Sequence, residues 1–426
     1  MRRTRTNARL RRAPATGPAA LASIAALALG GMALAGMLSS CARERIVSRQ
    51  QPLSLANVPT IRVRLTGPAT DGQVISSTGG YRLWVDGRVF SESAGAMPQT
   101  SVRRTGGRWQ FNALSVRGNE VTIEPLSGLL RCGETAYRGR LRLLPVGDEQ
   151  FTVVNHVDLE SYLAGVLAKE LYPSWSQTTY GALAVAARTF ALYNMKTYGV
   201  GRDYDVGDDE SSQVYGGASA ETDKSWQAVR ATHGRVLTYG PKGRERIFMA
   251  QYSACCGGVV NSASVIRDAA DIPPLRGGQR CDDCRYCPRY SWPPVRISKA
   301  DIYRAVAAAY PAVASLGGLT TVRTAIVTDY GRPVWLDLVG PTGKAVRLRA
   351  EDLRLVLNRS GLGRGQLNSM NCRIVDVGGA IEFAGSGFGH GVGLCQWGAQ
   401  GKAEKGWRAE EILLFYYPES TILPAY

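Results

Sequence analysis

Two neighbouring helical patterns in residues 157–195 most constrain what this chain can fold into. The first segment reads VDLESYLAGVLAKELYPSW, and its apolar residues recur at the three-and-four spacing of one helix face. They are Leu159, Tyr162, Leu163, Val166 and Leu167. After a Ser-Trp-Ser turn, the second segment reads YGALAVAARTFALYNM, which is rich in Ala and Leu and long enough for a packed helix. The sequence therefore predicts two packed helices flanking one loop.

Glu170 is the next residue on the apolar face of the first helix. Burial raises the free energy of an ionised carboxylate, so a Glu held there has a raised pKa and can deliver a proton near neutral pH. The pattern thus indicates a general acid. The structural alternative is that Glu170 only ends the helix before Pro173 and pairs with Lys169 or an arginine.

The two segments resemble the stage II sporulation protein D (SpoIID) family, which includes the LytB-type amidase enhancers. The resemblance continues in Gln213-Val214-Tyr215, in YSACCGGVVNSASV from Tyr252, and in GFGHGVGLCQWGAQGKAEKGWRAEEILLFYYPEST from Gly387. It spans roughly residues 155–422 in the family's order. It implies an α+β fold in which a SpoIID-like catalytic domain forms a glycan-binding groove.

The resemblance also implies peptidoglycan glycan strands as substrate and lytic transglycosylase chemistry with Glu170 as the catalytic acid. Ordinary glycosidases use two carboxyl groups. A lytic transglycosylase uses the C6 hydroxyl of muramic acid as nucleophile and needs only one, and it leaves a 1,6-anhydro product. Cofactors are not expected for this catalysis.

Five further residues match family motifs and are expected to bind substrate. They are Arg188, Gln213, Tyr215, His390 and Gln396. Arg188 lies within a helical pattern and is equally suited to a structural ion pair.

His390 and Gln396 belong to a glycine-dense stretch, residues 385–397, that the resemblance places along the groove of the catalytic Glu. So many glycines permit positive φ and a close backbone approach to a ligand. The pattern lacks the phosphate-binding signatures. Cys395 and His390 could instead act as nucleophile and base, although this rests only on their proximity in one loop.

The cysteines form a second informative set. Eight follow Cys41: Cys132, Cys255, Cys256, Cys281, Cys284, Cys287, Cys372 and Cys395. The run CDDCRYC has a double C-x-x-C spacing that suits a structural zinc ion, with Cys281, Cys284, Cys287 and Cys256 (or Cys255) as ligands. Disulfides and an Fe–S cluster are the alternatives.

Some members of the resembled family hold zinc through a His and two Cys just before Gln-Val-Tyr. Here that stretch reads RDYDVGDDESSQVY from Arg202 and contains neither residue type. The family's zinc site is therefore not expected at that place.

The N-terminus predicts export. An arginine-rich start and an apolar run over residues 18–38 are typical of a bacterial signal sequence, here residues 1–40. It ends in Leu38-Ser39-Ser40-Cys41, which resembles a lipobox, so Cys41 is the expected lipidation site of a membrane-anchored lipoprotein of the cell envelope. An uncleaved transmembrane anchor is the alternative.

Beyond the signal, the sequence predicts three parts. Residues 41–60 are polar and unpatterned, as in a linker. Residues 61–150 contain short alternating apolar runs separated by turn residues and form a β-rich region. Residues 151–423 form the SpoIID-like domain, with a Cys-rich insertion near residues 281–287.

The charge does not indicate a nucleic-acid partner. The formal charge is +16, but six arginines lie within the first twelve residues, and without them it would be +10. A basic exported protein also suits an anionic cell envelope, and no nucleic-acid motif is present. The expected partners are glycan strands, the membrane through a lipid and a cell-wall amidase, because the competing function is a non-catalytic, peptidoglycan-binding enhancer of that amidase.

Overall fold

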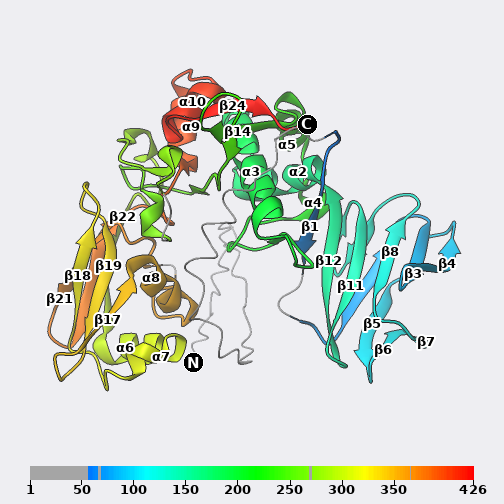
Figure 1. Cartoon of the computed structure of the whole chain (residues 1–426), viewed down its shortest axis with the longest axis horizontal. Helices are drawn as coiled ribbons and strands as arrows, with labels where there is room; N and C mark the ends of the chain where they lie inside the picture. The colour runs from blue at the N-terminus through cyan, green and yellow to red at the C-terminus, as the bar shows by residue number, and fades with distance from the viewer. Residues whose placement is uncertain (1–55, 66–68, 268–270, 365) are drawn as a thin grey trace, which may run out of the picture. The chain divides into compact units, whose positions relative to one another are not determined.

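The computed structural model describes residues 56–65, 69–267, 271–364 and 366–426 (Figure 1). The expected signal sequence, the lipidation candidate Cys41 and most of the 41–60 linker lie outside these residues. In the described part, no helix is both long enough and apolar enough to cross a bilayer. Helices and mainly antiparallel sheets together confirm the α+β class.

Strands build the N-terminal part of the described chain, as its alternating patterns predict (Figure 1). They are β1 (Thr60–Arg64), β2 (Gln73–Ser77), β3 (Tyr81–Val85), β4 (Arg88–Ser93), β5 (Thr100–Thr105), β6 (Arg108–Phe111), β7 (Leu114–Val116), β8 (Val121–Pro125), β9 (Leu130–Cys132), β10 (Thr135–Tyr137), β11 (Arg140–Val146) and β12 (Gln150–Asp158).

These strands form two sheets that share one core. The seven-stranded sheet has the order β13-β1-β12-β11-β8-β3-β4, where β13 is Val206–Gly207, and the six-stranded sheet has the order β10-β9-β2-β5-β6-β7. Trp109 of the second sheet lies edge-on to Phe151 of the first, with ring centroids 5.3 Å apart. The β11–β12 hairpin carries the strands past residue 150 and directly into the first helix.

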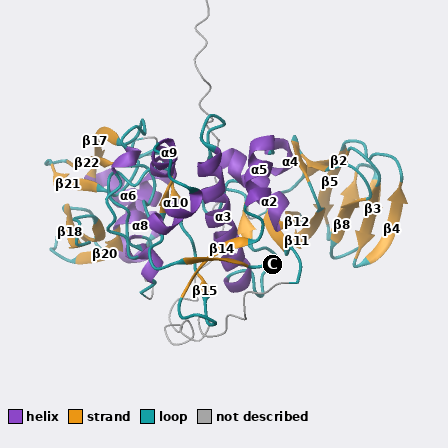
Figure 2. Cartoon of the chain, turned by 90° about the horizontal axis from the view of Figure 1, so that it is seen from above, coloured by secondary structure: helices purple, strands orange, loops and turns teal. Residues whose placement is uncertain are grey.

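The two predicted helices are confirmed as α2 (Leu159–Glu170) and α3 (Gln177–Thr197), which pack together (Figure 2). Each begins at a side-chain cap. Asp158 accepts a hydrogen bond from the Ser161 N–H at 2.9 Å, and Ser176 accepts one from the Thr178 N–H at 3.2 Å. Helix α2 ends at Glu170, because Leu171 has extended dihedral angles.

The remaining elements around these helices complete the first core. They are α4 (Gly217–Ala220), α5 (Asp223–Ala231), β14 (Arg235–Tyr239), β15 (Arg246–Ile247), β16 (Tyr252–Ser253), the 3-10 turns η1 (Ala263–Val265), η2 (Pro273–Leu275) and η3 (Asp282–Cys284), β23 (Leu394–Cys395), α9 (Gln396–Glu404), α10 (Ala409–Tyr416) and β24 (Thr421–Pro424). Strand β16 pairs with β23 in parallel, although about 140 residues separate them.

Residues between β16 and β23 contain a second hydrophobic core that the sequence patterns did not predict. It is built from β17 (Ser291–Ser298), α6 (Lys299–Ala309), α7 (Pro311–Ala314), β18 (Thr321–Val327), β19 (Pro333–Val339), β20 (Ala345–Arg349), α8 (Ala350–Arg359), β21 (Cys372–Asp376) and β22 (Ala380–Ser386). The insertion is therefore much longer than the Cys-rich stretch near residues 281–287.

A buried ion pair joins the two central helices. Arg188 of α3 donates from Nε and Nη2 to the carboxylate of Glu160 on α2, at 2.8 and 2.7 Å. The Arg188 side chain is fully buried, and the Tyr426 hydroxyl and the Gly234 N–H also donate to Glu160. Burial opposes ionisation of Glu160, yet Arg188 and the other donors hold its pKa below the usual value.

We expect Arg188→Met to lower the unfolding free energy by about 3–5 kcal/mol, because it leaves the Glu160 carboxylate buried without a counter-charge. Urea denaturation would measure this loss. The control is the double variant Glu160→Gln/Arg188→Met, which should lose less because no buried charge remains. A single-variant loss below about 1 kcal/mol would contradict a dominant role for the pair.

Candidate active site

Glu170 is the residue around which the candidate site is arranged. It is half-buried at the carboxyl end of α2. Its Oε1 accepts hydrogen bonds from the Val214 N–H at 3.1 Å and from the Tyr252 hydroxyl at 3.5 Å. Its Oε2 accepts one from Nε2 of Gln396 at 2.9 Å. Three segments distant in sequence therefore meet at one carboxyl group.

The environment of Glu170 balances its two protonation states. Burial raises its pKa above the ordinary value, whereas hydrogen bonds from Val214, Gln396 and Tyr252 favour the charged form and oppose the rise. The negative end of the α2 dipole also disfavours a charge there. Oε1 has two donors and Oε2 has one, so Oε2 is the atom with room for a proton. A raised pKa together with these donors suits a group that gives and then takes back a proton.

A chain of side chains directs the Tyr252 hydroxyl at Glu170. The Tyr162 hydroxyl donates to Oε1 of Gln213 at 3.2 Å, and Nε2 of Gln213 donates to the Tyr252 oxygen at 2.9 Å. Burial raises the pKa of Tyr252 well above the usual value, so its phenol stays neutral and keeps the proton that it donates. Gln213 therefore acts on Glu170 through Tyr252.

Two other expected substrate residues lie in structural contacts. Arg188 is held by Glu160, as its structural alternative predicts. Tyr215 is 6% exposed, donates from its hydroxyl to Asn155 Oδ1 at 3.1 Å and packs on Tyr162. These contacts leave little of either side chain for a ligand, whereas Gln396 contacts Glu170 directly.

The glycine-dense loop adopts the backbone that its composition predicts. Gly387, Gly389, Gly391 and Gly393 all have positive φ. A Cβ on Gly393 would lie 2.0 Å from the Gln251 carbonyl oxygen. At this position the close approach is to the protein's own main chain, which explains the glycine without a ligand.

His390 and Cys395 are engaged separately. His390 Nδ1 accepts a hydrogen bond from the Val392 N–H at 3.0 Å, and burial lowers the His390 pKa to about 4. Cys395 Sγ accepts from the Cys256 and Gly398 N–H groups, each at 3.3 Å. The imidazole is therefore neutral at physiological pH, and these contacts do not arrange the two residues as nucleophile and base.

Aromatic rings lie next to Glu170 in both the chain and the fold. Tyr172, Trp175 and Trp397 form a cluster with ring centroids 5.1–5.7 Å apart. Tyr172 is 55% exposed, whereas Trp175 is buried. Helix α9 holds this cluster in place, since Gln400 Oε1 accepts from the Ser176 N–H and the Thr179 hydroxyl at 2.9 and 2.8 Å.

The group of cysteines that could hold a metal differs from the expected one. Cys256, Cys281, Cys284 and Cys395 are buried, and their Sγ atoms all lie within 4.8 Å of one another. Cys395, and not the expected Cys287, is therefore the fourth member of the group. The reason is the parallel pairing of β23 with β16, which brings Cys395 beside the Cys255-Cys256 segment.

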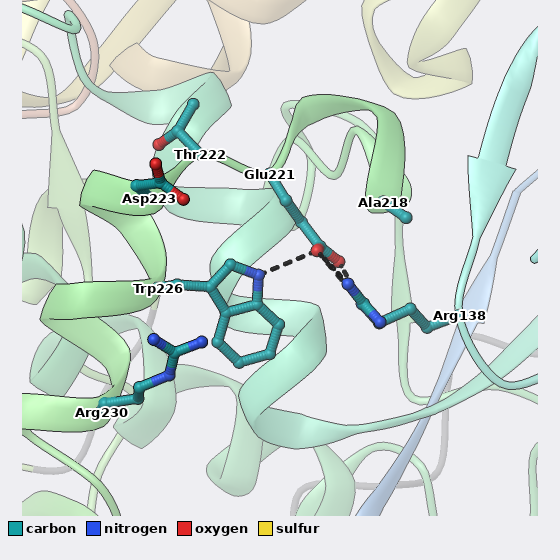
Figure 3. A pocket seen from close by; sticks show the side chains of 7 residues that line it. All are labelled: Arg138, Ala218, Glu221, Thr222, Asp223, Trp226 and Arg230. Carbon is teal, nitrogen blue, oxygen red and sulfur yellow. Dashed lines mark hydrogen bonds and ion pairs between the residues drawn. The ribbon is translucent and has the colours of Figure 1, made fainter. Parts of the chain in front are cut away.

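A separate surface hollow does not include Glu170. Figure 3 shows Arg138 and Trp226 both directed at Glu221, and each donates to Glu221 Oε2 at 2.8 Å. The lining residues are Arg138, Ala218, Glu221, Thr222, Asp223, Trp226 and Arg230. Glu221 is ion-paired with Arg138 in this hollow, whereas Glu170 is held by neutral hydrogen-bond donors. The hollow therefore does not offer a second carboxyl group suited to donate a proton.

Comparison with known proteins places this site in a family. A family model described as "Stage II sporulation protein" matches residues 147–239. An uncharacterised protein of Brachyspira hyodysenteriae is 30% identical over 368 residues, covering 85% of this chain and 93% of that protein. The chain belongs to the stage II sporulation protein D family.

Two named relatives come from Bacillus subtilis. Stage II sporulation protein D is 26% identical over 293 residues, which cover 64% of this chain and 76% of that protein. The amidase enhancer is 25% identical over 299 residues, which cover 61% of this chain and 40% of that protein. The family model includes Glu170 and Val214 but ends before Tyr252 and Gln396.

Sequence reasoning singled out Glu170 and Gln396 but missed two of the three donors to the carboxyl group. Tyr252 lies in the recognised YSACCGG segment and was not distinguished within it, and the Val214 donor is a main-chain group that has no side-chain signature. The ring cluster could have been predicted from Trp397, because this aromatic residue is adjacent to Gln396 in the sequence.

Because the pKa of Glu170 is raised by folding, its ionisation costs stability. The folded state keeps the proton above the ordinary Glu pKa of about 4.3, so stability present below that pH is lost as pH rises through the folded-state pKa. As the pH rises from 4 to 8, we expect the urea midpoint of Glu170→Gln to increase relative to the urea midpoint of the unmodified protein. The exposed Glu134→Gln, a residue that is not among the groups acting on Glu170, is the control for replacement of a carboxyl group by an amide. If the urea midpoint of the unmodified protein instead increased relative to that of Glu170→Gln, the pKa of Glu170 would be lowered by folding.

Proposed function

We propose that this protein is a peptidoglycan lytic transglycosylase that acts in bacterial cell-wall remodelling. The observation that carries the proposal is the half-buried Glu170 carboxyl group, with one oxygen held by two donors and the other by one. The family membership supports the substrate class, since relatives are named stage II sporulation protein D and amidase enhancer.

In the proposed reaction, protonated Glu170 gives its proton to the glycosidic oxygen that leaves C1 of N-acetylmuramic acid. The C1–O bond breaks through an oxocarbenium-like transition state. The C6 hydroxyl of the same sugar then bonds to C1 and returns its proton to the Glu170 carboxylate. No water is consumed, and the intramolecular attack gains from proximity.

The donors around Glu170 suit both halves of this cycle. Tyr252 and Val214 hold Oε1 in place while Oε2 loses and regains the proton. Gln396 donates to Oε2 and stabilises the carboxylate that forms after the first transfer. Tyr172, exposed beside the site, offers a ring face for the CH groups of a sugar.

A non-catalytic function as an enhancer of a cell-wall amidase is the second candidate. The observation that favours it is the similarity to a protein named amidase enhancer. In that case the aromatic cluster would bind glycan and Glu170 would contribute only hydrogen bonds.

We expect full-length protein to release glycan fragments with 1,6-anhydromuramic ends from purified, peptide-free glycan strands. Glu170→Gln should lower the rate at least about 100-fold, because the amide cannot donate the acid proton. Mass spectrometry of the products measures this, with the exposed Glu134→Gln as the control.

The other outcomes separate the two functions. Equal activity of the unmodified protein and Glu170→Gln would exclude Glu170 as the acid. Glycan that is retained but never cut, together with faster product release by an added amidase, would establish the enhancer function instead.

The proposal includes export and a lipid anchor at Cys41, supported by the arginine-rich start and the apolar residues 18–38. Cells that express the protein should incorporate labelled palmitate into it, and Cys41→Ala should abolish the label. Retained label in that variant would place the lipid elsewhere. Cys132→Ala is the control for loss of a cysteine.

A further inference from the structure

Four buried cysteine side chains converge on one point. They are Cys256, Cys281, Cys284 and Cys395, and their Sγ atoms all lie within 4.8 Å of one another. The Sγ atoms of Cys256 and Cys284 are 3.7 Å apart. Four thiolates at about 2.3 Å from one tetrahedral ion would be about 3.8 Å apart, whereas a disulfide needs about 2.05 Å. The spacing fits a single metal ion.

The surroundings of the sulfur atoms suit thiolates. Cys395 Sγ accepts N–H groups from Cys256 and Gly398, each at 3.3 Å, and so caps helix α9 at its positive end. The Tyr416 hydroxyl lies 3.1 Å from Cys281 Sγ. Negative charge on these buried sulfurs is therefore met by several donors.

Helix α9 approaches the cluster through a glycine. Gly398 faces the sulfurs from its first turn, and a Cβ there would lie 2.4 Å from Cys281 Sγ and 2.2 Å from the Tyr416 oxygen. Only glycine lets the helix approach this closely. At Gly401, one turn on, a Cβ would likewise lie 2.5 Å from the Asp283 carbonyl oxygen of the Cys-rich segment.

We propose that Cys256, Cys281, Cys284 and Cys395 bind one zinc ion, and that this ion fixes the two chain segments that carry Tyr252 and Gln396, donors to Glu170. Zinc suits the site because it takes four thiolates in a tetrahedron without a redox change. An Fe–S cluster distributes its ligands over several iron atoms, so its thiolates do not all converge on one point.

The connection to Glu170 runs through the parallel pair β16 and β23. Strand β16 begins with Tyr252 and leads to Cys256, and β23 ends at Cys395, which precedes Gln396. Tyr252 on β16 and Gln396, the residue that follows β23, thus each lie within a few residues of a ligand of the proposed ion. Through the ion, Cys395 and Cys256 act as positioning residues for the carboxyl group's partners.

Two nearby cysteines serve as matched controls. Cys255 Sγ lies 3.8 Å from the Cys284 carbonyl oxygen, and Cys287 lies in the same buried segment. Neither sulfur belongs to the group of four. Cys287→Ser removes a buried thiol from the same place without removing a proposed ligand, and Cys255→Ser separates Cys256 from the neighbouring cysteine, whose side chain also interacts with Cys284 and Cys395.

Metal analysis of the full-length protein, purified under reducing conditions, tests the ligand set. We expect about one zinc ion per chain, at least tenfold weaker zinc binding in Cys395→Ser against a competing chelator, and unchanged binding in both controls. Zinc retained by Cys395→Ser but lost from Cys287→Ser would overturn the set. In a parallel preparation purified without reductant, thiols that resist alkylation until reduced, with no metal bound, would overturn it in favour of disulfides.

A measurement on the unmodified chain avoids any variant that fails to fold. Replacement of zinc by Co²⁺ should give the visible bands of a tetrahedral four-sulfur site, and X-ray absorption should show only sulfur at about 2.3 Å. Visible absorption by bound iron and sulfide in the purified protein would overturn the zinc assignment.

Removal of zinc by a chelator tests the positioning role. It should change the fluorescence of Trp397, which follows Gln396 on α9, and Trp397→Phe should remove most of this change. Unchanged fluorescence on zinc loss would reject the link between the ion and the Glu170 donors. None of these measurements depends on glycan cleavage, so the zinc proposal and the proposed function can fail independently.

Discussion

A carboxyl group keeps a useful proton at the end of a buried helix only when its desolvation is nearly matched by hydrogen bonds. For Glu170 that balance depends on α2, which places the side chain, and on donors that come from outside the helix. With fewer donors the pKa of the group would rise further, and a guanidinium at the same place would lower it. Glu160, ten residues earlier on the same helix, shows the second outcome beside Arg188.

The donors reach Glu170 because segments that are distant in sequence pack together, and further residues hold those segments in place. The main chain at Val214 follows the β13 region, Tyr252 lies on β16, and Gln396 begins α9. Behind them, Gln213 orients Tyr252, and Cys256 after β16 and Cys395 at the end of β23 meet Cys281 and Cys284 of the η3 region in the four-cysteine group. Positioning therefore comes from contacts one step removed from the carboxyl group.

Local patterns predicted the fold well where the periodicity was strong. The helix α2, the Ala-rich α3 and the alternating N-terminal strands all formed as expected, because burial of their apolar residues decides each of them, although α2 and α3 are buried on most sides rather than on one face. The second core was not predicted, since its short mixed elements depend on contacts with one another. Cys395 was missed as a metal-ligand candidate because its partners depend on strand pairing across about 140 residues.

Strands β16 and β23 lie side by side, yet the whole second core is inserted between them in the chain. An insertion whose two ends are anchored next to each other closes a loop at its base, and the entropy of such a loop changes slowly with its length. The inserted body can therefore grow, shrink or be exchanged during evolution while the geometry at Glu170 stays the same. Differences between relatives in substrate reach or partner choice would then be expected to concentrate in this insertion.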